Sequence, residues 1–115
     1  LPLYNLPPGE RARTVPGKTY EYMASGCPIL AAVPDGDTRD YLVRAGTGFP
    51  CRPDDVPGMC NIIDKVYQAW KRGERVTRLD EKYVQQFERR NLTRRLAEVF
   101  DQVLDEEDEV DRLGR

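Results

Sequence analysis

The stretch at positions 16–33 most constrains the fold of this chain, because it has the pattern of a short helix, a tight turn and a buried strand. Positions 18–25 show helical periodicity, Gly26 suits a left-handed helix end, and Pro28 follows where the helix cannot continue. Positions 29–33 are continuously apolar, which is typical of a parallel strand that is covered on both faces. The order of these elements predicts an α/β fold.

The start of this helix is also the first candidate site. A loop that leads into a helix N-terminus attracts anions, because free backbone N–H groups and the positive end of the helix dipole point into it. Gly17 would allow a ligand to approach closely, Lys18 adds a cation, and Glu21 could accept hydrogen bonds from a diol. A phosphate clamp beside a diol acceptor suits a nucleotide sugar. The alternative is a capped helix packed on a sheet, with Glu21 solvated.

The polar loop before this helix carries further candidate ligands for a phosphate. Arg11 and Arg13 could reach a diphosphate, since a guanidinium group suits bidentate phosphate contacts. Thr14 could contribute a hydroxyl to the same loop. The alternative is that both arginines lie in an exposed loop and are simply solvated.

The sequence PGKTYEYMASGCPIL at positions 16–30 resembles the signature of the group 1 (family 4) retaining glycosyltransferases. In that family the Glu of the E-Y-M-A-x-G segment binds the ribose hydroxyls of the donor nucleotide, and Glu21 matches it. The preceding loop and helix start cradle the diphosphate, which the resemblance maps onto positions 15–19, Thr19 included. The family often has a second Glu where this chain has Arg13, and a sub-branch with P-G-K also lacks it. The resemblance covers about positions 1–55 and is strongest over 16–34.

The resemblance implies two Rossmann-like domains, the GT-B fold, with the active site in the cleft between them. We expect this chain to be a fragment: the C-terminal, donor-binding portion, a Rossmann-like three-layer αβα domain with a short parallel sheet over positions 1–104. Positions 105–115, which hold six acidic residues within seven positions, are expected to form a disordered tail.

The implied activity belongs to the full-length protein. It would be a hexosyltransferase-like transfer of a sugar from a nucleotide diphosphate to an acceptor hydroxyl, with retention, and the chain alone would be inactive. The expected partners are the nucleotide sugar and a sugar or lipid-linked acceptor held by an N-terminal domain that this chain lacks. The expected location is cytoplasmic, with any membrane association arising from parts not present here. No cofactor beyond the donor is expected.

Two alternatives stay open. One is another enzyme of the same fold, such as a nucleotide-sugar epimerase. The other is a non-catalytic GT-B-like domain that serves protein interaction, which Arg13 and the absence of histidine leave open.

Composition excludes several other classes. The 115 residues suffice for one domain, and a net charge of −2 gives no electrostatic case for nucleic-acid binding. The absence of histidine excludes a Ser-His or Cys-His nucleophile within this chain, as well as any histidine metal site. Three cysteines without a C-x-x-C motif indicate neither a disulfide framework nor zinc, and no metal site is expected.

The segment after the first strand predicts a second helix and a second strand. Asp37 or Thr38 is expected to cap a helix over positions 39–44. Positions 47–52 have the pattern of a short strand that Pro53 ends.

A long helix is predicted from Asp54 or Asp55, either of which can cap it, to an end between Lys71 and Gly73. Its apolar residues recur at helical spacing, which predicts a face packed into the core. This face consists of Met59, Cys60, Ile62, Ile63, Val66, Tyr67 and Trp70.

The remaining sequence predicts two more helices, one capped by Asp80 and a last one that begins at Asn91 or Thr93. In the family that this chain resembles, terminal helices often cross back over the other domain. The apolar face of the last helix would therefore be uncovered here, and we expect the chain to self-associate through it. This face consists of Leu92, Leu96, Val99, Phe100 and Val103.

Overall fold

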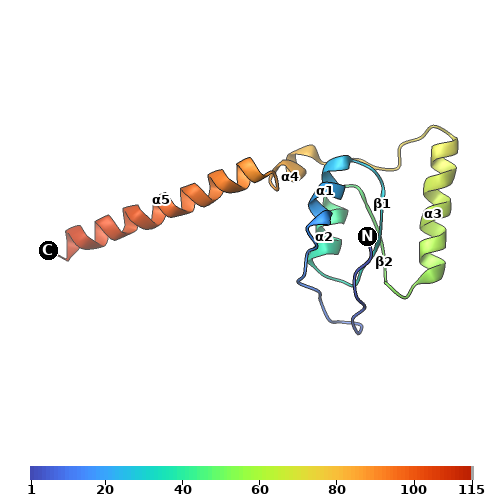
Figure 1. Ribbon diagram of the computed structural model, residues 1–115, viewed down its shortest axis with the longest axis horizontal. Helices are drawn as coiled ribbons and strands as arrows, with labels where there is room; N and C mark the ends of the chain where they lie inside the picture. Colours follow the sequence, from blue (N-terminus) through green and yellow to red (C-terminus); the bar gives the residue numbers. More distant parts are fainter. Residues whose placement is uncertain (115) are drawn as a thin grey trace. The chain divides into compact units, whose positions relative to one another are not determined.

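The computed structural model describes residues 1–114 and divides into two compact units, the first ending at Val84 and the second beginning at Gln85 (Figure 1). The described residues form two strands and five helices. In chain order these are α1 (Lys18–Ser25), β1 (Ile29–Ala32), α2 (Asp37–Arg44), β2 (Gly48–Cys51), α3 (Val56–Lys71), α4 (Glu81–Gln85) and α5 (Arg89–Leu113).

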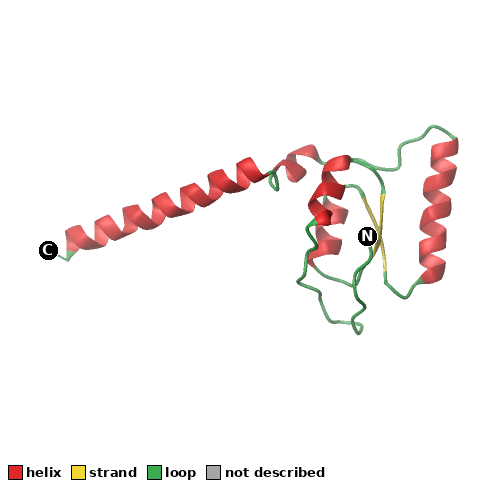
Figure 2. Cartoon of the chain, in the orientation of Figure 1, coloured by secondary structure: helices red, strands yellow, loops and turns green. Residues whose placement is uncertain are grey.

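The sheet of the first unit is small and parallel. Ile29 of β1 lies opposite Gly48 of β2, and Ala32 lies opposite Cys51 at the other end. The first residues of the chain pair with the free edge of β1 through a parallel bridge between Pro2 and Ala32. Helices α1 and α2 lie on one side of the strands and α3 lies on the other (Figure 2). The predicted α/β class is therefore confirmed, whereas the Rossmann-like GT-B assignment stays a prediction.

The core lies between β1 and the two helices α1 and α2. Met23 of α1 and Leu42 of α2 are completely buried, as is Ala31 of β1. Along β1, buried and half-buried residues alternate, so one face is fully covered and the other only partly. Since neither face is open to solvent, a strand without polar residues suits this position.

The predicted left-handed end of the first helix is confirmed. Gly26 has φ 69° and its N–H donates to the carbonyl of Met23 at 3.3 Å. The segment 77–80 then ties this helix end to the end of α2. The Thr77 hydroxyl donates to the Gly26 carbonyl at 3.1 Å, and the Arg78 N–H donates to the Gly46 carbonyl at 3.1 Å.

The helix caps were predicted with mixed success. Asp55 caps α3, because its carboxylate accepts the N–H of Gly58 at 2.9 Å. The prediction that Asp37 or Thr38 caps α2 is wrong, since both lie inside the helix and Gly36 is the N-cap without a side-chain hydrogen bond. The reason is that the backbone of Gly36 is already held by the preceding loop, so the helix begins earlier than a side-chain cap would place it.

The prediction that the apolar face of α3 is core is largely wrong. Ile63 is 57% exposed, Tyr67 is 50% exposed and Trp70 is 72% exposed, and Ala69 is the one buried residue of this helix. The physical reason is area. Two strands of four residues cannot cover the whole apolar face of a 16-residue helix.

The second unit consists mainly of α5, which continues through the acidic stretch to Leu113. The structure thus differs from the disordered tail predicted for 105–115, and Arg115 lies outside the described residues. Glutamate is a good helix former, and Val110 and Leu113 continue the apolar periodicity of the helix through this stretch. The first unit ends at Val84, and the predicted domain boundary at position 104 stays a prediction.

No helix within the described residues is both long and apolar enough to cross a membrane.

Replacement of Gly36 by alanine should destabilise the first unit. A Cβ at this position would lie 2.1 Å from the carbonyl oxygen of Ala12, which belongs to the backbone and cannot move away cheaply. We expect the free energy of unfolding to fall by about 1–3 kcal/mol in urea denaturation followed by circular dichroism. Gly17→Ala is the matched control, because a Cβ there meets nothing within 4 Å and φ is −55°. Equal losses in the two variants would contradict this account of Gly36.

Candidate functional site

The loop that precedes α1 is attached to the turn at the carboxyl end of β1. The Ala12 N–H donates to the Asp35 carbonyl at 2.8 Å, and the Asp37 N–H donates to the Ala12 carbonyl at 3.0 Å. The Thr38 hydroxyl donates to the Thr14 carbonyl at 2.9 Å. In open α/β sheets, ligands bind at the carboxyl ends of the strands. The loop and the first turn of α1 therefore lie at the edge of the sheet where a ligand is expected.

At the start of α1, the backbone is open to solvent at Gly17. The N–H groups of Thr19 and Tyr20 are used within the turn, by the carbonyls of Pro16 at 2.9 Å and Gly17 at 3.3 Å. Gly17 is exposed, and the space where a Cβ would lie is empty. The glycine is thus not required by the backbone conformation, and its lack of a side chain leaves room above the helix start for a ligand.

Three charged side chains of the predicted site are exposed and available. Arg13, Lys18 and Glu21 form no ion pair with any other residue in the part of the chain that the structure describes. Glu21 lies in the first turn of α1, where the helix dipole favours a carboxylate. The loop therefore offers two cations and one anion along a single short stretch of backbone.

Arg11 differs from Arg13 because it is bound to the adjacent helix. Its guanidinium donates to the Asp40 carboxylate at 2.5 Å and lies 4.0 Å from Asp37. The hydrogen bond to Asp40 raises the pKa of Arg11 above its ordinary value. Arg11 thus fixes the loop to α2, and Arg13 is the loop arginine that stays free to meet a phosphate.

The two threonines of the predicted site have opposite environments. Thr14 is exposed, and its hydroxyl accepts a hydrogen bond from the Tyr4 hydroxyl at 3.4 Å. Thr19 is completely buried, and its hydroxyl has no hydrogen-bond partner among the described residues. The structure therefore places Arg13, Thr14, Gly17, Lys18 and Glu21 on the surface of one loop and helix turn, and turns the Thr19 side chain into the core.

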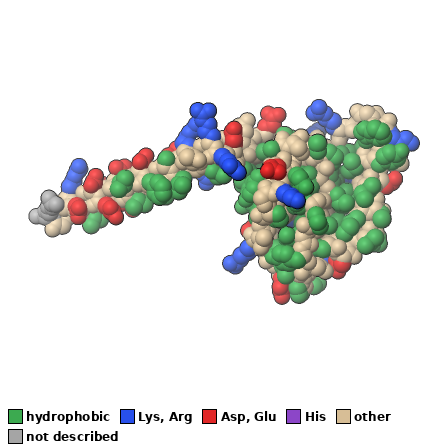
Figure 3. All heavy atoms as spheres, viewed as in Figure 1, with side chains coloured by type: hydrophobic (Ala, Val, Ile, Leu, Met, Phe, Trp, Pro, Cys, Tyr) green, Lys and Arg blue, Asp and Glu red, His purple; other side chains and the backbone are tan. Residues whose placement is uncertain are grey.

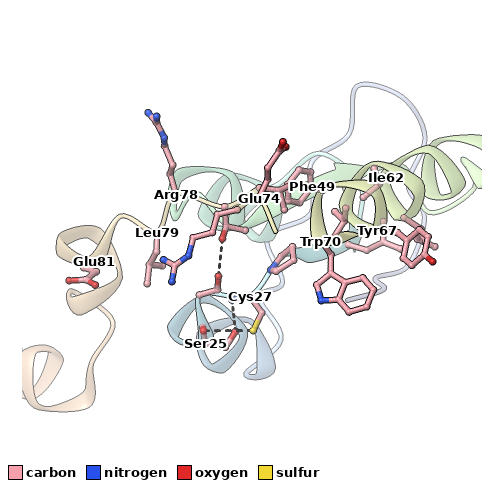
Figure 4. A pocket seen from close by; sticks show the side chains of 18 residues that line it. Ser25, Cys27, Phe49, Ile62, Tyr67, Trp70, Glu74, Arg78, Leu79 and Glu81 are labelled. Carbon is pink, nitrogen blue, oxygen red and sulfur yellow. Dashed lines mark hydrogen bonds between the residues drawn. The ribbon is translucent and has the colours of Figure 1, made fainter. Parts of the chain in front are cut away.

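A groove of the first unit lies at the opposite end of α1, where the helix ends at Gly26 (Figure 4). It has a volume of about 1200 Å³ and lies between α3 and the segment 74–79, with Leu30 and Phe49 of the sheet at its base. Tyr67 and Trp70 line it, with their rings stacked at a centroid distance of 5.9 Å. None of the six predicted site residues lines this groove.

Sequence reasoning missed this groove because it assigned the apolar face of α3 to the core. The sequence did contain a signal, because α3 has more large apolar side chains than two short strands can cover. The groove is mainly apolar in character, and Arg75 and Arg78 also line it.

Comparison of the chain with protein-family models, with curated proteins and with solved structures found no match. Among the described residues, no group of three or more histidine, cysteine, aspartate or glutamate side chains is arranged to hold a metal ion. The assignment of function therefore depends on the geometry of the loop and of the first turn of α1.

The buried hydroxyl of Thr19 leads to a test of its role. Thr19→Val removes a buried polar group that has no partner, so the free energy of unfolding should stay within about 1 kcal/mol of the parent or rise. Thr38→Val is the matched control, because it removes a buried hydroxyl that does donate a hydrogen bond, and it should cost about 1–3 kcal/mol. Urea denaturation of the two variants measures both values. A larger loss for Thr19→Val than for Thr38→Val would show that the Thr19 hydroxyl has a stabilising partner.

Proposed function

We propose that this chain binds the nucleotide-diphosphate portion of a sugar donor for a GT-B glycosyltransferase of the group 1 type. The observation that carries the proposal is the exposed, unpaired set of Arg13, Lys18 and Glu21, held at the carboxyl end of β1 by the Ala12 backbone. This placement is a separate observation from the sequence resemblance. The placement and the resemblance both favour a binding site on the same surface of the molecule.

The proposed roles follow from the chemistry of each side chain. The diphosphate lies against the start of α1, where the Gly17 backbone leaves room and Lys18 and Arg13 supply positive charge. Thr14 adds a hydroxyl at the edge of the loop. The Glu21 carboxylate accepts hydrogen bonds from the ribose hydroxyls, about one helical turn further on. Thr19 supports the helix from the core and does not touch the ligand.

In the whole enzyme, these residues would act on the leaving group. Transfer of a sugar with retention requires the departing nucleoside diphosphate to be held in position and its growing negative charge to be stabilised. Lys18, Arg13 and the dipole of α1 supply that stabilisation in this proposal. The acceptor would be bound by a second domain, so we propose donor binding for this chain and transfer for a protein that contains both domains.

Titration of the chain with UDP, GDP and ADP, followed by NMR of the backbone amides, tests donor binding. We expect saturable shifts confined to positions 13–21, with one base preferred. Glu21→Ala and Lys18→Ala should each weaken binding roughly tenfold, which is the effect of losing one charge-assisted hydrogen bond.

The matched control is Glu81→Ala, which removes an exposed carboxylate from the first turn of a different helix, α4. This variant should bind the nucleotide as the parent does. The absence of saturable shifts at millimolar nucleotide, or equal effects of Glu21→Ala and Glu81→Ala, would contradict the proposed site.

A second candidate is a non-catalytic interaction domain. The observation in its favour is the exposed aromatic surface of α3, where Trp70 is 72% exposed beside Tyr67. This candidate predicts no response of positions 13–21 to any nucleotide. The same titration therefore separates the two.

A further inference from the structure

The long helix α5 has an apolar stripe with the spacing of a coiled coil. The spacing alternates between three and four residues, so that about three heptads are continuous along one side of the helix. Every apolar member of the stripe is at least 43% exposed, and α5 buries none of its residues. The stripe consists of Leu92, Leu96, Val99, Val103, Glu106, Val110 and Leu113.

Such a helix lacks the packing that normally stabilises helices in proteins. Most helical stability comes from burial of an amphipathic face, and α5 presents its face over 25 residues, a length of about 37 Å (Figure 3). Phe100 and Leu104 flank the stripe and are 60% and 59% exposed, which widens the apolar surface. The hydrophobic effect therefore favours an elongated partner with a matching stripe.

The charges on α5 are separated along its length. The first turns, at positions 89–95, carry four arginines and no acidic residue. Positions 105–111 carry six acidic residues and no basic one. Two copies of the helix in parallel would set the six acids of each chain side by side, which is unfavourable. Two copies in antiparallel orientation would set the arginines of each chain beside the acids of the other.

We propose that α5 pairs with α5 of a second copy of this chain as an antiparallel coiled coil centred near Asp101. In this register Leu92 lies at the level of Val110 of the second copy, and Val99 lies at the level of Val103. The one charged member of the stripe, Glu106, then lies at the level of Leu96 of the second copy, next to Arg95 of that copy. The antiparallel order is therefore favoured by the charges, and the apolar residues of the stripe supply the contacts between the helices.

The register also places the remaining flanking residues. In an antiparallel pair of helices, positions just outside the stripe meet their equivalents across the interface, and here Arg95 of each chain faces Glu109 of the other. Phe100 meets its own counterpart at the centre of the pair. Charges in such flanking positions set the orientation and the choice of partner more than they set the affinity. A second copy of the chain thus binds the apolar face of α5, because its arginines and acidic residues match those of the first copy in the antiparallel orientation.

Sedimentation velocity over a wide range of concentration tests the pairing. The parent chain should change from monomer to dimer as concentration rises. The double variant Val99→Asp, Val103→Asp places charges at the central layers and should weaken dimerisation roughly a hundredfold or more. Ala97→Asp, an exposed position of α5 outside the stripe, is the matched control and should dimerise as the parent does.

The orientation needs its own measurement. With Cys27, Cys51 and Cys60 replaced by serine, one chain carries Thr93→Cys and another carries Glu107→Cys. In the antiparallel pair, position 93 lies near position 107 of the second copy, and each position lies about 18–24 Å from its own equivalent. Since a disulfide requires Cα atoms within about 7 Å, oxidation should cross-link only the mixture of the two chains.

Circular dichroism of every variant establishes that the helix is retained, so that lost dimerisation is not mistaken for lost folding. A parent chain that stays monomeric at all concentrations would overturn the proposal. Cross-linking of the Thr93→Cys chain with itself would overturn the antiparallel orientation. Equal dimerisation by the stripe variant and by Ala97→Asp would place the interface elsewhere.

Discussion

The close backbone contact between Ala12 and Gly36 is the constraint on which the candidate site depends. The loop before α1 would otherwise be a free connection of polar residues. Two hydrogen bonds hold Ala12 to the turn after β1, and the absence of a side chain at Gly36 makes the approach possible. The helix that follows is therefore positioned at its N-terminus by the loop. It is positioned at its C-terminus by Gly26, which turns the chain into β1. Lys18 and Glu21 are exposed at a defined place because both ends of α1 are fixed.

The small sheet explains the rest of the surface. It covers one face of α1 and α2 well, but it leaves the outer part of α3 exposed, so that Tyr67 and Trp70 line an open groove instead of a core. The last helix α5 buries none of its residues. The molecule thus carries two apolar surfaces of different kinds, one aromatic on α3 and one aliphatic on α5. Only the second has a strong separation of charge along its length, and this separation is the basis of the antiparallel pairing that we propose for it.

Much of the local structure was predictable because it depends on neighbouring residues. The helix end at Gly26 and the cap at Asp55 follow from chemistry within a few residues, and the structure confirms both. The cap of α2 was not predictable in the same way. Gly36 takes that position because the backbone of Ala12, distant in sequence, lies against it. The acidic stretch also forms helix, although its charge alone suggested a disordered tail. The reason is that the helical spacing of apolar residues, which begins at Leu92, continues to Leu113.

The sequence by itself determined the elements and the chemical character of the candidate site. Helix periodicity, glycine turns and the choice of charged side chains all depend on residues that are close together in the sequence. It identified Gly17, Lys18 and Glu21 as the start of a helix that suits an anion and a diol. Only the tertiary structure decided which of the candidates reach the surface. Arg11 is bound to Asp40 while Arg13 stays free, and the Thr19 hydroxyl is buried in the core. The physical reason is that the exposure and the ion pairing of a side chain arise from contacts between segments far apart in the chain. A local sequence pattern does not reveal these contacts.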